Sequence, residues 1–301
     1  MSKPANRLWL VLYLALGLIW GSSFFLIHEV LRAVPPIGMS FWRCFLGALT
    51  MLVIVLISRT KANLDLKSVL LIGGGGMFMN GIPWMLFGYA QSHVTSILAS
   101  IINGATPIMT LLALMTIFRS EKTKLHVIIG ILIGAVGLMI ALAAWQGFGE
   151  NDPLSIAALV GAIACYGIGG PYIRRFVTPI GVPNTVTSFV QLGVSTVFVL
   201  PFYIFTGPLF VGEVTPSIAL AMFTLGALGS GIAYVFYYRV IADAGSAIAN
   251  TVTYITPLVA VFLGVLVLGE TLYWYEPVGA VVVILGAAIS QGYFTRKKAV
   301  A

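Results

Sequence analysis

Charged residues divide this sequence into long stretches that carry no charge. Asp, Glu, Lys and Arg are absent from the windows 8–28, 68–118, 125–149, 153–173, 176–212, 214–238, 244–269 and 277–295. A helix needs roughly 20 apolar residues to cross the hydrocarbon core of a bilayer. Most windows fit one such helix, and 68–118 fits two with a break near Gln91. A further span, near 37–58, is interrupted only by Arg43. The pattern predicts an all-α membrane protein with ten transmembrane helices.

The composition excludes an ordinary water-soluble protein. Only 8% of the residues are charged and 59% are hydrophobic, whereas soluble domains carry about 25% charged residues. The apolar runs are continuous rather than alternating, which excludes an outer-membrane barrel. The first run follows Lys3 and Arg7, as in a signal peptide, but it has full spanning length. We expect it to be an uncleaved signal anchor.

The formal net charge of +7 is explained by topology rather than by nucleic-acid binding. If ten spans start from a cytoplasmic N-terminus, the cytoplasmic segments contain 14 of the 16 basic residues. Short cytoplasmic loops are enriched in Lys and Arg, and this bias sets the orientation. We therefore predict cytoplasmic N- and C-termini and a multi-pass protein of the cell (inner) membrane. The expected surroundings are the lipid bilayer, without a nucleic-acid partner.

The sequence repeats itself at an offset of 150 residues. S-I-L-A-S-I-I-N-G-A-T-P at 96–107 aligns with S-A-I-A-N-T-V-T-Y-I-T-P at 246–257, and Gly76 and Gly81 align with Gly226 and Gly231. Two five-helix units, 1–150 and 151–301, explain this offset. Because five is odd, the second unit enters the membrane inverted. Inverted repeats with a site at their interface are common in secondary transporters, although channels and membrane enzymes can also be duplicated.

These repeats resemble the EamA-type branch of the drug/metabolite transporter superfamily. The matching features are W-G-S-S-F at 20–24, Pro35-Pro36 followed by Arg43, T-P at 106–107, A-G-S-A-I-A-N-T-V-T-Y-I-T-P at 244–257 and L-G-E at 268–270. In the first half R-S-E at 119–121 stands in place of L-G-E. Within this branch the chain is most similar to the YddG-like exporters of aromatic amino acids. The resemblance implies ten helices and export of small metabolites by alternating access.

Polar and aromatic residues recur at equivalent positions within the inner spans of both halves. The offset relates Asn80 to Ser230, Trp84 to Tyr234 and Ser100 to Asn250. Polar groups within a span are costly, so their recurrence favours a functional role. We predict a substrate cavity between the repeats lined by Trp20, Ser23, Asn80, Trp84, Ser100, Asn103, Tyr166, Tyr234, Tyr237, Asn250 and Thr253. The alternatives are hydrogen bonding between helices for the polar residues and anchoring at the membrane interface for the aromatic ones, which we favour for Trp274.

Pro107 and Pro257 lie at equivalent positions inside spans. Each proline removes a backbone donor and clashes with the carbonyl four residues earlier, which belongs to Asn103 or Thr253. We consider these prolines as hinges whose freed carbonyls bind an ammonium group or let the helices rock. A static kink is an equal alternative.

The predicted cavity residues carry no full charge, which favours a neutral or zwitterionic solute with an apolar or aromatic side chain. Arg43 is expected to be structural, with its guanidinium extending to the outer interface; binding of a carboxylate there is the alternative. Efflux of lipophilic cations is the second functional hypothesis, because aromatic faces attract cations.

Other classes of function lack support from motifs. No catalytic constellation stands out, so we predict a transporter rather than an enzyme, without cofactor or metal. All nine acidic residues lie outside the middle of the predicted spans, which argues against obligatory proton coupling. The glycine-rich spans near 125–149 and 277–295 are expected to serve peripheral packing or a homodimer surface.

Overall fold

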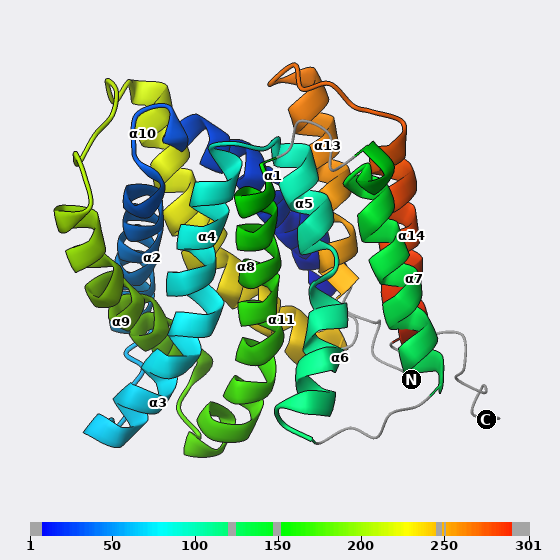
Figure 1. Ribbon diagram of the computed structural model, residues 1–301. Helices are drawn as coiled ribbons and strands as arrows, with labels where there is room; N and C mark the ends of the chain where they lie inside the picture. Colours follow the sequence, from blue (N-terminus) through cyan, green and yellow to red (C-terminus); the bar gives the residue numbers. More distant parts are fainter. Residues whose placement is uncertain (1–7, 120–124, 147–151, 245–248, 250, 291–301) are drawn as a thin grey trace.

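The computed structural model describes residues 8–119, 125–146, 152–244, 249 and 251–290, and within these ranges the chain forms helices and no strands (Figure 1). Seven helices are long and apolar enough to cross a membrane: Leu8–Leu31, Pro36–Ile57, Leu66–Gln91, Ser96–Thr116, Pro153–Ile180, Asn184–Phe205 and Pro216–Val240. Three further apolar helices are shorter, Leu125–Ala141, Val252–Leu266 and Tyr275–Ser290. The prediction of an all-helical chain with many apolar spans is confirmed.

The first half of the chain comprises α1 (Leu8–Leu31), α2 (Pro36–Ile57), α3 (Leu66–Gly76), η1 (Met77–Gly81), α4 (Ile82–Gln91), α5 (Ser96–Asn103), α6 (Thr106–Thr116) and α7 (Leu125–Ala141), followed by the short turn η2 (Ala144–Gln146). The second half comprises α8 (Pro153–Tyr172), η3 (Ile173–Val177), η4 (Thr178–Ile180), α9 (Asn184–Phe205), α10 (Pro216–Phe223), η5 (Thr224–Ile232), α11 (Ala233–Ala244), η6 (Thr251–Tyr254), α13 (Thr256–Leu266) and α14 (Tyr275–Ser290).

Aspartates fix the start of two of these helices. The carboxylate of Asp65 accepts a hydrogen bond from Ser68 N at 3.0 Å, at the beginning of α3. Asp152 accepts from Ser155 Oγ at 2.7 Å and from Ser155 N at 2.9 Å, at the beginning of α8. These bonds satisfy amide groups that have no partner within the helix. They stabilise the ionised carboxylate, so the pKa of Asp152 lies below its ordinary value, the Ser155 hydroxyl being the largest cause.

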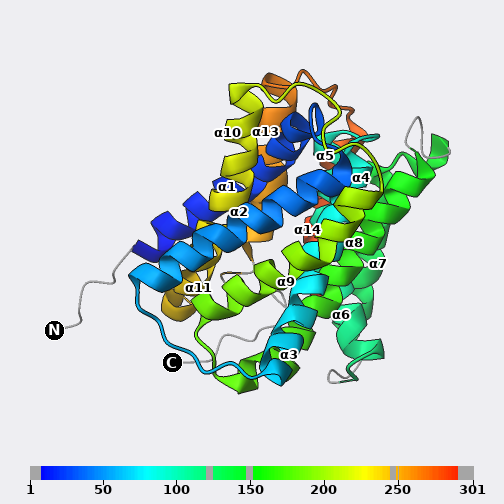
Figure 2. The same cartoon turned by 90° about the vertical axis from the view of Figure 1, so that its left-hand side faces the viewer.

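Helices of the first half pack mainly on helices of the second half. α2 packs on α9 and η5, α3 packs on α9, and α4 and α6 pack on α8. Figure 2 shows α9 lying along α2 and beside α3. α1 contacts both α11 and α13. The apolar faces of each half are therefore covered largely by the other half.

Glycines bring α7 and α14 into close contact at one edge of the molecule (Figure 1). A Cβ atom added at Gly137 would lie 2.5 Å from Val283 N, and one added at Gly279 would lie 2.5 Å from Ala141 N. Neither distance is compatible with a side chain, so the two backbones approach as closely as they do because of these glycines. The two helices pack on each other, as expected for peripheral packing elements.

Two π-helical segments occupy equivalent places in the two halves. η1 (Met77–Gly81) and η5 (Thr224–Ile232) each join two α-helical segments of one continuous helix. The offset of 150 residues superimposes η1 on residues 227–231 of η5. Wide turns of this kind occur frequently at functional sites. Asn80 lies in the first segment and Ser230 in the second.

Candidate functional site

A cluster of polar and aromatic side chains from both halves surrounds Arg43 on α2. The Arg43 side chain is buried, with 8% of the residue exposed. Its Cζ atom lies 4.2 Å from the centroid of the Trp84 ring, and its Nε donates a hydrogen bond to Ser230 Oγ at 3.0 Å. Tyr166 and Tyr234 lie near enough to interact electrostatically with its charge. We refer to Arg43, Asn80, Trp84, Tyr166, Ser230 and Tyr234 as the Arg43 cluster.

Besides the bond from Arg43 to Ser230, two further hydrogen bonds in this cluster connect the halves. Trp84 Nε1 donates to the Tyr166 hydroxyl at 3.1 Å and thereby joins α4 to α8. The Tyr234 hydroxyl donates to Asn80 Oδ1 at 3.0 Å and joins α11 to η1. Asn80 is completely buried, and its Nδ2 has no hydrogen-bond partner in the described part of the chain. A buried amide donor without a partner is rare and marks a place where a further polar group fits.

Aromatic rings extend the cluster toward α1. The Trp20 ring lies 6.3 Å from Tyr234 and 5.4 Å from Tyr237, measured between centroids. Trp20 Nε1 donates to the carbonyl of Gly229 at 3.2 Å, which fixes the indole against η5. On the other side Phe87 stacks on Tyr166 at 6.0 Å. The structure thus brings together Trp20, Asn80, Trp84, Tyr166, Tyr234 and Tyr237 of the predicted cavity residues.

Other predicted residues use their polar groups within their own helix. The Ser23 hydroxyl donates to the carbonyl of Ile19 at 3.1 Å, and the Ser100 hydroxyl donates to that of Ile97 at 2.7 Å. Asn103 and Thr253 are half-buried; Asn103 is the last residue of α5, and Thr253 lies in η6. Asn250 lies outside the described residues.

Pro107 and Pro257 lie in the first turn of α6 and α13, each after a break in the helix. The carbonyl of Asn103 accepts a hydrogen bond from Thr106 Oγ1 at 2.7 Å, and the carbonyl of Thr253 accepts one from Thr256 Oγ1 at 3.0 Å. The two breaks are built in the same way. These carbonyls were expected to be free for a solute, but a threonine hydroxyl already occupies one acceptor position on each.

Arg43 lies in a different place from the one expected. The prediction that it extends to the outer interface is wrong, because the Trp84 ring and the Ser230 hydroxyl hold its guanidinium inside the protein. The interior cluster therefore contains a full positive charge. One signal in the sequence bears on this position: Arg43 is the only charged residue in its span, and charges within spans usually face the interior of the helix bundle.

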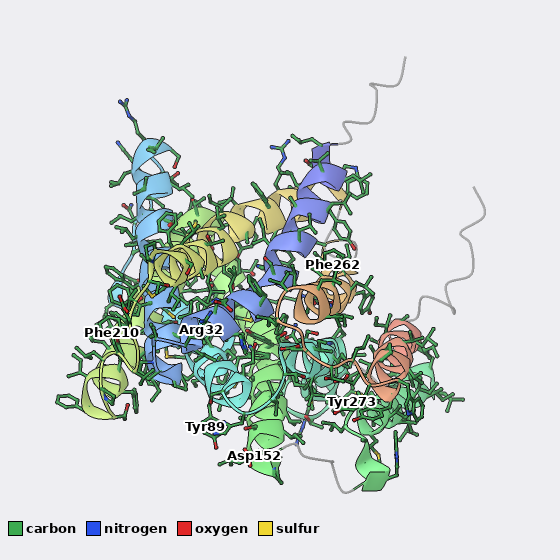
Figure 3. The ribbon with its side chains drawn as sticks, turned by 90° about the horizontal axis from the view of Figure 1, so that it is seen from above. Arg32, Tyr89, Asp152, Phe210, Phe262 and Tyr273 are labelled. Atoms are coloured by element: carbon green, nitrogen blue, oxygen red, sulfur yellow. The ribbon has the colours of Figure 1, made fainter. Side chains whose placement is uncertain are left out.

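A second contact between the halves lies at one end of the molecule. Glu270, in the loop after α13, accepts hydrogen bonds at the start of α5 from Ser96 N at 2.8 Å, Ser96 Oγ at 3.0 Å and Ile97 N at 3.1 Å. The carboxylate thus caps a helix of the other half. Figure 3 views the molecule from this end, where Arg32, Tyr89, Asp152 and Tyr273 lie. The repeat in the sequence paired Glu270 with Glu121 but suggested no role for either.

Comparison with known proteins assigns the family. The sequence profile of the EamA-like transporter family matches residues 7–143 and, a second time, residues 153–291. The uncharacterized inner membrane transporter YedA of Escherichia coli (strain K12) is 28% identical over 281 residues, which cover 91% of this chain and 88% of YedA. The uncharacterized transporter YyaM of Bacillus subtilis (strain 168) is 23% identical over 292 residues, covering 94% and 93% of the two chains.

A solved crystal structure shares the fold. It is 18% identical in sequence and superimposes with a TM-score of 0.63 over 96% of this chain and 98% of its own. The helical fold, the apolar spans and the two matches of one family profile agree with one another. The chain is therefore a multi-pass, non-enzymatic membrane transporter that belongs to the EamA-like transporter family.

Proposed function

We propose that this protein is a secondary transporter of the cell membrane that exports neutral amino acids, above all aromatic ones, as YddG-like exporters do. In this proposal ten transmembrane helices form two inverted five-helix repeats, 1–150 and 151–301, with both termini in the cytoplasm. The substrate binds between the repeats and reaches the two sides of the membrane by alternating access. Seven long apolar helices, three shorter ones and two matches of one family profile support this arrangement.

The observation that carries the proposal is a pair of reciprocal hydrogen bonds. Trp84 and Tyr234 are equivalent positions of the two halves in the sequence. Trp84 donates to Tyr166 of the second half, and Tyr234 donates to Asn80 of the first half. Inverted-repeat transporters bind their substrate at the repeat interface near the middle of the bilayer. Equivalent positions of the duplicated unit thus each bond to the opposite half, which supports a substrate site between the repeats.

The chemistry of the cluster fits an aromatic amino acid. Trp20, Trp84, Tyr166, Tyr234 and Tyr237 offer ring faces and edges for a flat apolar side chain. Aromatic pairs are worth about 0.5–1.5 kcal/mol beyond the area they bury. The unpaired Nδ2 of Asn80 offers a hydrogen-bond donor to the polar end of such a solute.

Burial of the cluster supports alternating access. Trp84 is 3% exposed and Asn80 is not exposed at all, so a solute reaches them only when helices move apart. The breaks before Thr106 and Thr256 provide positions at which α5 can turn relative to α6, and η6 relative to α13. In this proposal Pro107 and Pro257 act as hinges that prevent these breaks from closing into continuous helix.

Counterflow in proteoliposomes tests the function. Vesicles are preloaded in turn with Trp, Phe, Met, Thr, Glu or a lipophilic cation, and uptake of the labelled compound is measured. We expect saturable exchange of neutral amino acids that falls by roughly tenfold or more in Trp84→Ala, because a buried aromatic side chain at a binding site carries a large share of the binding energy.

Trp274→Ala is the matched control, since Trp274 is 69% exposed and lies in the loop between α13 and α14. It should retain wild-type exchange. If only the lipophilic cation moves, the protein is an efflux carrier and the amino-acid proposal fails. Flux that does not saturate would instead identify a channel.

A further inference from the structure

We propose that Arg43 binds the carboxylate of the transported solute, so that the protein selects compounds with one carboxylate and rejects lipophilic cations. This inference rests on the proposed function, because it concerns the same substrate. It assigns the recognition of the substrate carboxylate to the positive charge of a single residue.

The positive charge of Arg43 has no carboxylate partner in the described ranges. The ion pairs found there join Arg32 to Glu29 and Arg239 to Asp243. Arg43 is 8% exposed and makes one hydrogen bond, from Nε to Ser230 Oγ. A buried charge within an apolar span is costly, and such residues mark substrate pathways when no protein group neutralises them. A bound anion would neutralise the charge.

The contacts of Arg43 leave the part of the guanidinium that can bind a carboxylate, Nη1 and Nη2, without a protein acceptor in the described chain. The Trp84 ring covers one face of the group at 4.2 Å, and Ser230 occupies Nε. Within the described chain, Nη1 and Nη2 donate to no acceptor. These two nitrogens present parallel N–H groups that match the two oxygens of a carboxylate. Trp84 and Ser230 therefore hold the guanidinium in place, and Nη1 and Nη2 remain available for a bidentate contact with a ligand.

A second unpaired donor belongs to the same cluster. Tyr234 holds Asn80 through Oδ1 at 3.0 Å, which fixes the amide and leaves Nδ2 without a partner. Asn80 belongs to η1, which contacts α2, the helix that carries Arg43. The cluster therefore combines one cation and one unpaired amide donor. Both groups favour an acceptor with negative charge.

The number of charges on the solute decides which class of anion can neutralise Arg43. One guanidinium balances one carboxylate, whereas a phosphate ester with two negative charges would leave one unbalanced in an apolar environment. A lipophilic cation would be repelled by the charge of Arg43, because no water screens the two charges from each other there. The aromatic rings attract cations, but Arg43 already occupies the Trp84 face. A solute with an aromatic side chain that presents one carboxylate to Arg43, and keeps any ammonium group away from it, therefore satisfies the cluster best.

Selectivity among indole compounds tests the inference. Counterflow of labelled Trp is measured in the presence of one of two competitors. Indole-3-propionate carries the carboxylate without the ammonium group, and tryptamine carries the ammonium group without the carboxylate. We expect inhibition of the wild type by indole-3-propionate and not by tryptamine. Arg43→Gln should weaken the apparent affinity for Trp and indole-3-propionate by roughly thirtyfold or more, and the discrimination against tryptamine should disappear.

Arg43→Lys and Arg32→Gln complete the series. Lys keeps the charge but not the planar pair of donors, so Arg43→Lys should retain part of the discrimination. Arg32→Gln removes a cation that is exposed and paired with Glu29, and it should behave as the wild type. An Arg43→Gln protein whose affinity for Trp falls, while tryptamine still fails to inhibit its remaining exchange, would contradict the assignment, because Arg43 would then serve only packing.

A binding measurement separates this inference from the proposed function. The melting temperature of purified protein is measured with and without about 5 mM indole-3-propionate, because a ligand that binds the folded state raises its stability. Stabilisation of the wild type but not of Arg43→Gln would support Arg43 even if no amino acid is exchanged. Equal stabilisation of both proteins would overturn the inference even if Trp exchange is found. If Arg43→Gln does not fold, Arg43→Lys and Ser230→Ala are compared in the same assay, and wild-type behaviour of both overturns the inference.

Discussion

Tyr234 illustrates at the scale of a residue how one side chain can serve both halves. Its hydroxyl donates to Asn80, and its ring lies 6.3 Å from Trp20 and near the charge of Arg43. A hydrogen bond between helices in a membrane contributes about 0.6 kcal/mol on average. The bond to Asn80 is therefore a minor term in stability, and its main effect is to orient the Asn80 amide.

Tyr234→Phe separates these two effects. Removing the hydroxyl should lower the stability by about 0.6 kcal/mol but raise the KM for exchange several-fold, since the Asn80 amide loses the bond that orients it. Melting temperature and counterflow measure the two quantities. Tyr203→Phe is the matched control, because the Tyr203 hydroxyl donates to the carbonyl of Leu209 outside the cluster. A KM that changes equally in both variants would show that Tyr234 has no special role.

Repetition in the sequence did not by itself separate the residues of the cluster from the other predicted residues. The offset of 150 residues relates Trp84 to Tyr234 and Asn80 to Ser230, and all four lie in the cluster. It also relates Ser100 to Asn250, yet the Ser100 hydroxyl donates to the carbonyl of Ile97 in its own helix, and the Ser23 hydroxyl likewise donates to that of Ile19. The residue type alone does not show whether a serine hydroxyl donates within its own helix or to another group. The burial of Arg43 depends on Trp84 and Ser230, which are distant in sequence, so the sequence alone could not establish it.

At the scale of helices, Glu270 fixes the start of α5 from the opposite half of the chain. Its carboxylate accepts from two backbone amides and one hydroxyl. Helix starts normally receive such bonds from a residue next to them in the sequence. Here Thr95 supplies one local bond, to Leu98 N, and Glu270 supplies the rest across the interface. Relative movement of α5 and α13 at this end has to break these bonds.

Glu270→Gln tests the strength of this contact. The neutral amide accepts more weakly and places an NH2 group near backbone donors, so we expect a loss of about 1–2 kcal/mol in stability and faster exchange if breaking the contact limits the rate. Thermal melting and initial rates of counterflow measure these effects. Glu213→Gln, at an exposed position in the loop before α10, should change neither. An unchanged melting temperature in Glu270→Gln would contradict the capping role.

The sequence predicted long helices more accurately than their interruptions. Charge-free windows identified the long spans because the cost of a charge in the bilayer controls where charges occur. Pro107 and Pro257 predicted a disturbance, and the helices do break before them. The π-helical segments η1 and η5 were not predicted. A wider turn shifts one hydrogen bond without changing the apolar composition, and glycines such as Gly76 and Gly226 are equally compatible with an α-helix or a π-helix.

For the molecule as a whole, the positions of the acidic residues bear on the driving force. Among the described acidic residues, Glu29 and Asp243 lie in the last turns of α1 and α11, and Glu276 lies in the first turn of α14. The others lie at helix starts or in loops: Asp65, Asp152, Glu213 and Glu270. Proton-coupled carriers keep a titratable group within the membrane as a relay. We therefore predict that transport follows the substrate gradient and continues when the proton gradient is collapsed.

An uncoupler added to proteoliposomes at constant substrate gradient checks this prediction. Initial rates should remain within about twofold of the untreated vesicles, a difference of less than 0.5 kcal/mol in activation free energy by the estimate that tenfold corresponds to about 1.4 kcal/mol. The solvent alone serves as the control. Complete loss of flux in the presence of the uncoupler would establish proton coupling and require a relay that involves other groups.

The contact between Arg43 and Ser230 also has a consequence for how the protein is made. The two residues are 187 positions apart in the sequence. At a synthesis rate of about 5–20 residues per second, Ser230 leaves the ribosome roughly 10–40 s after Arg43. During this interval the Trp84 ring is already available to Arg43, while its hydrogen-bond partner from the second half does not yet exist. A pause of the ribosome between these two residues would lengthen the time that the buried charge spends without this bond.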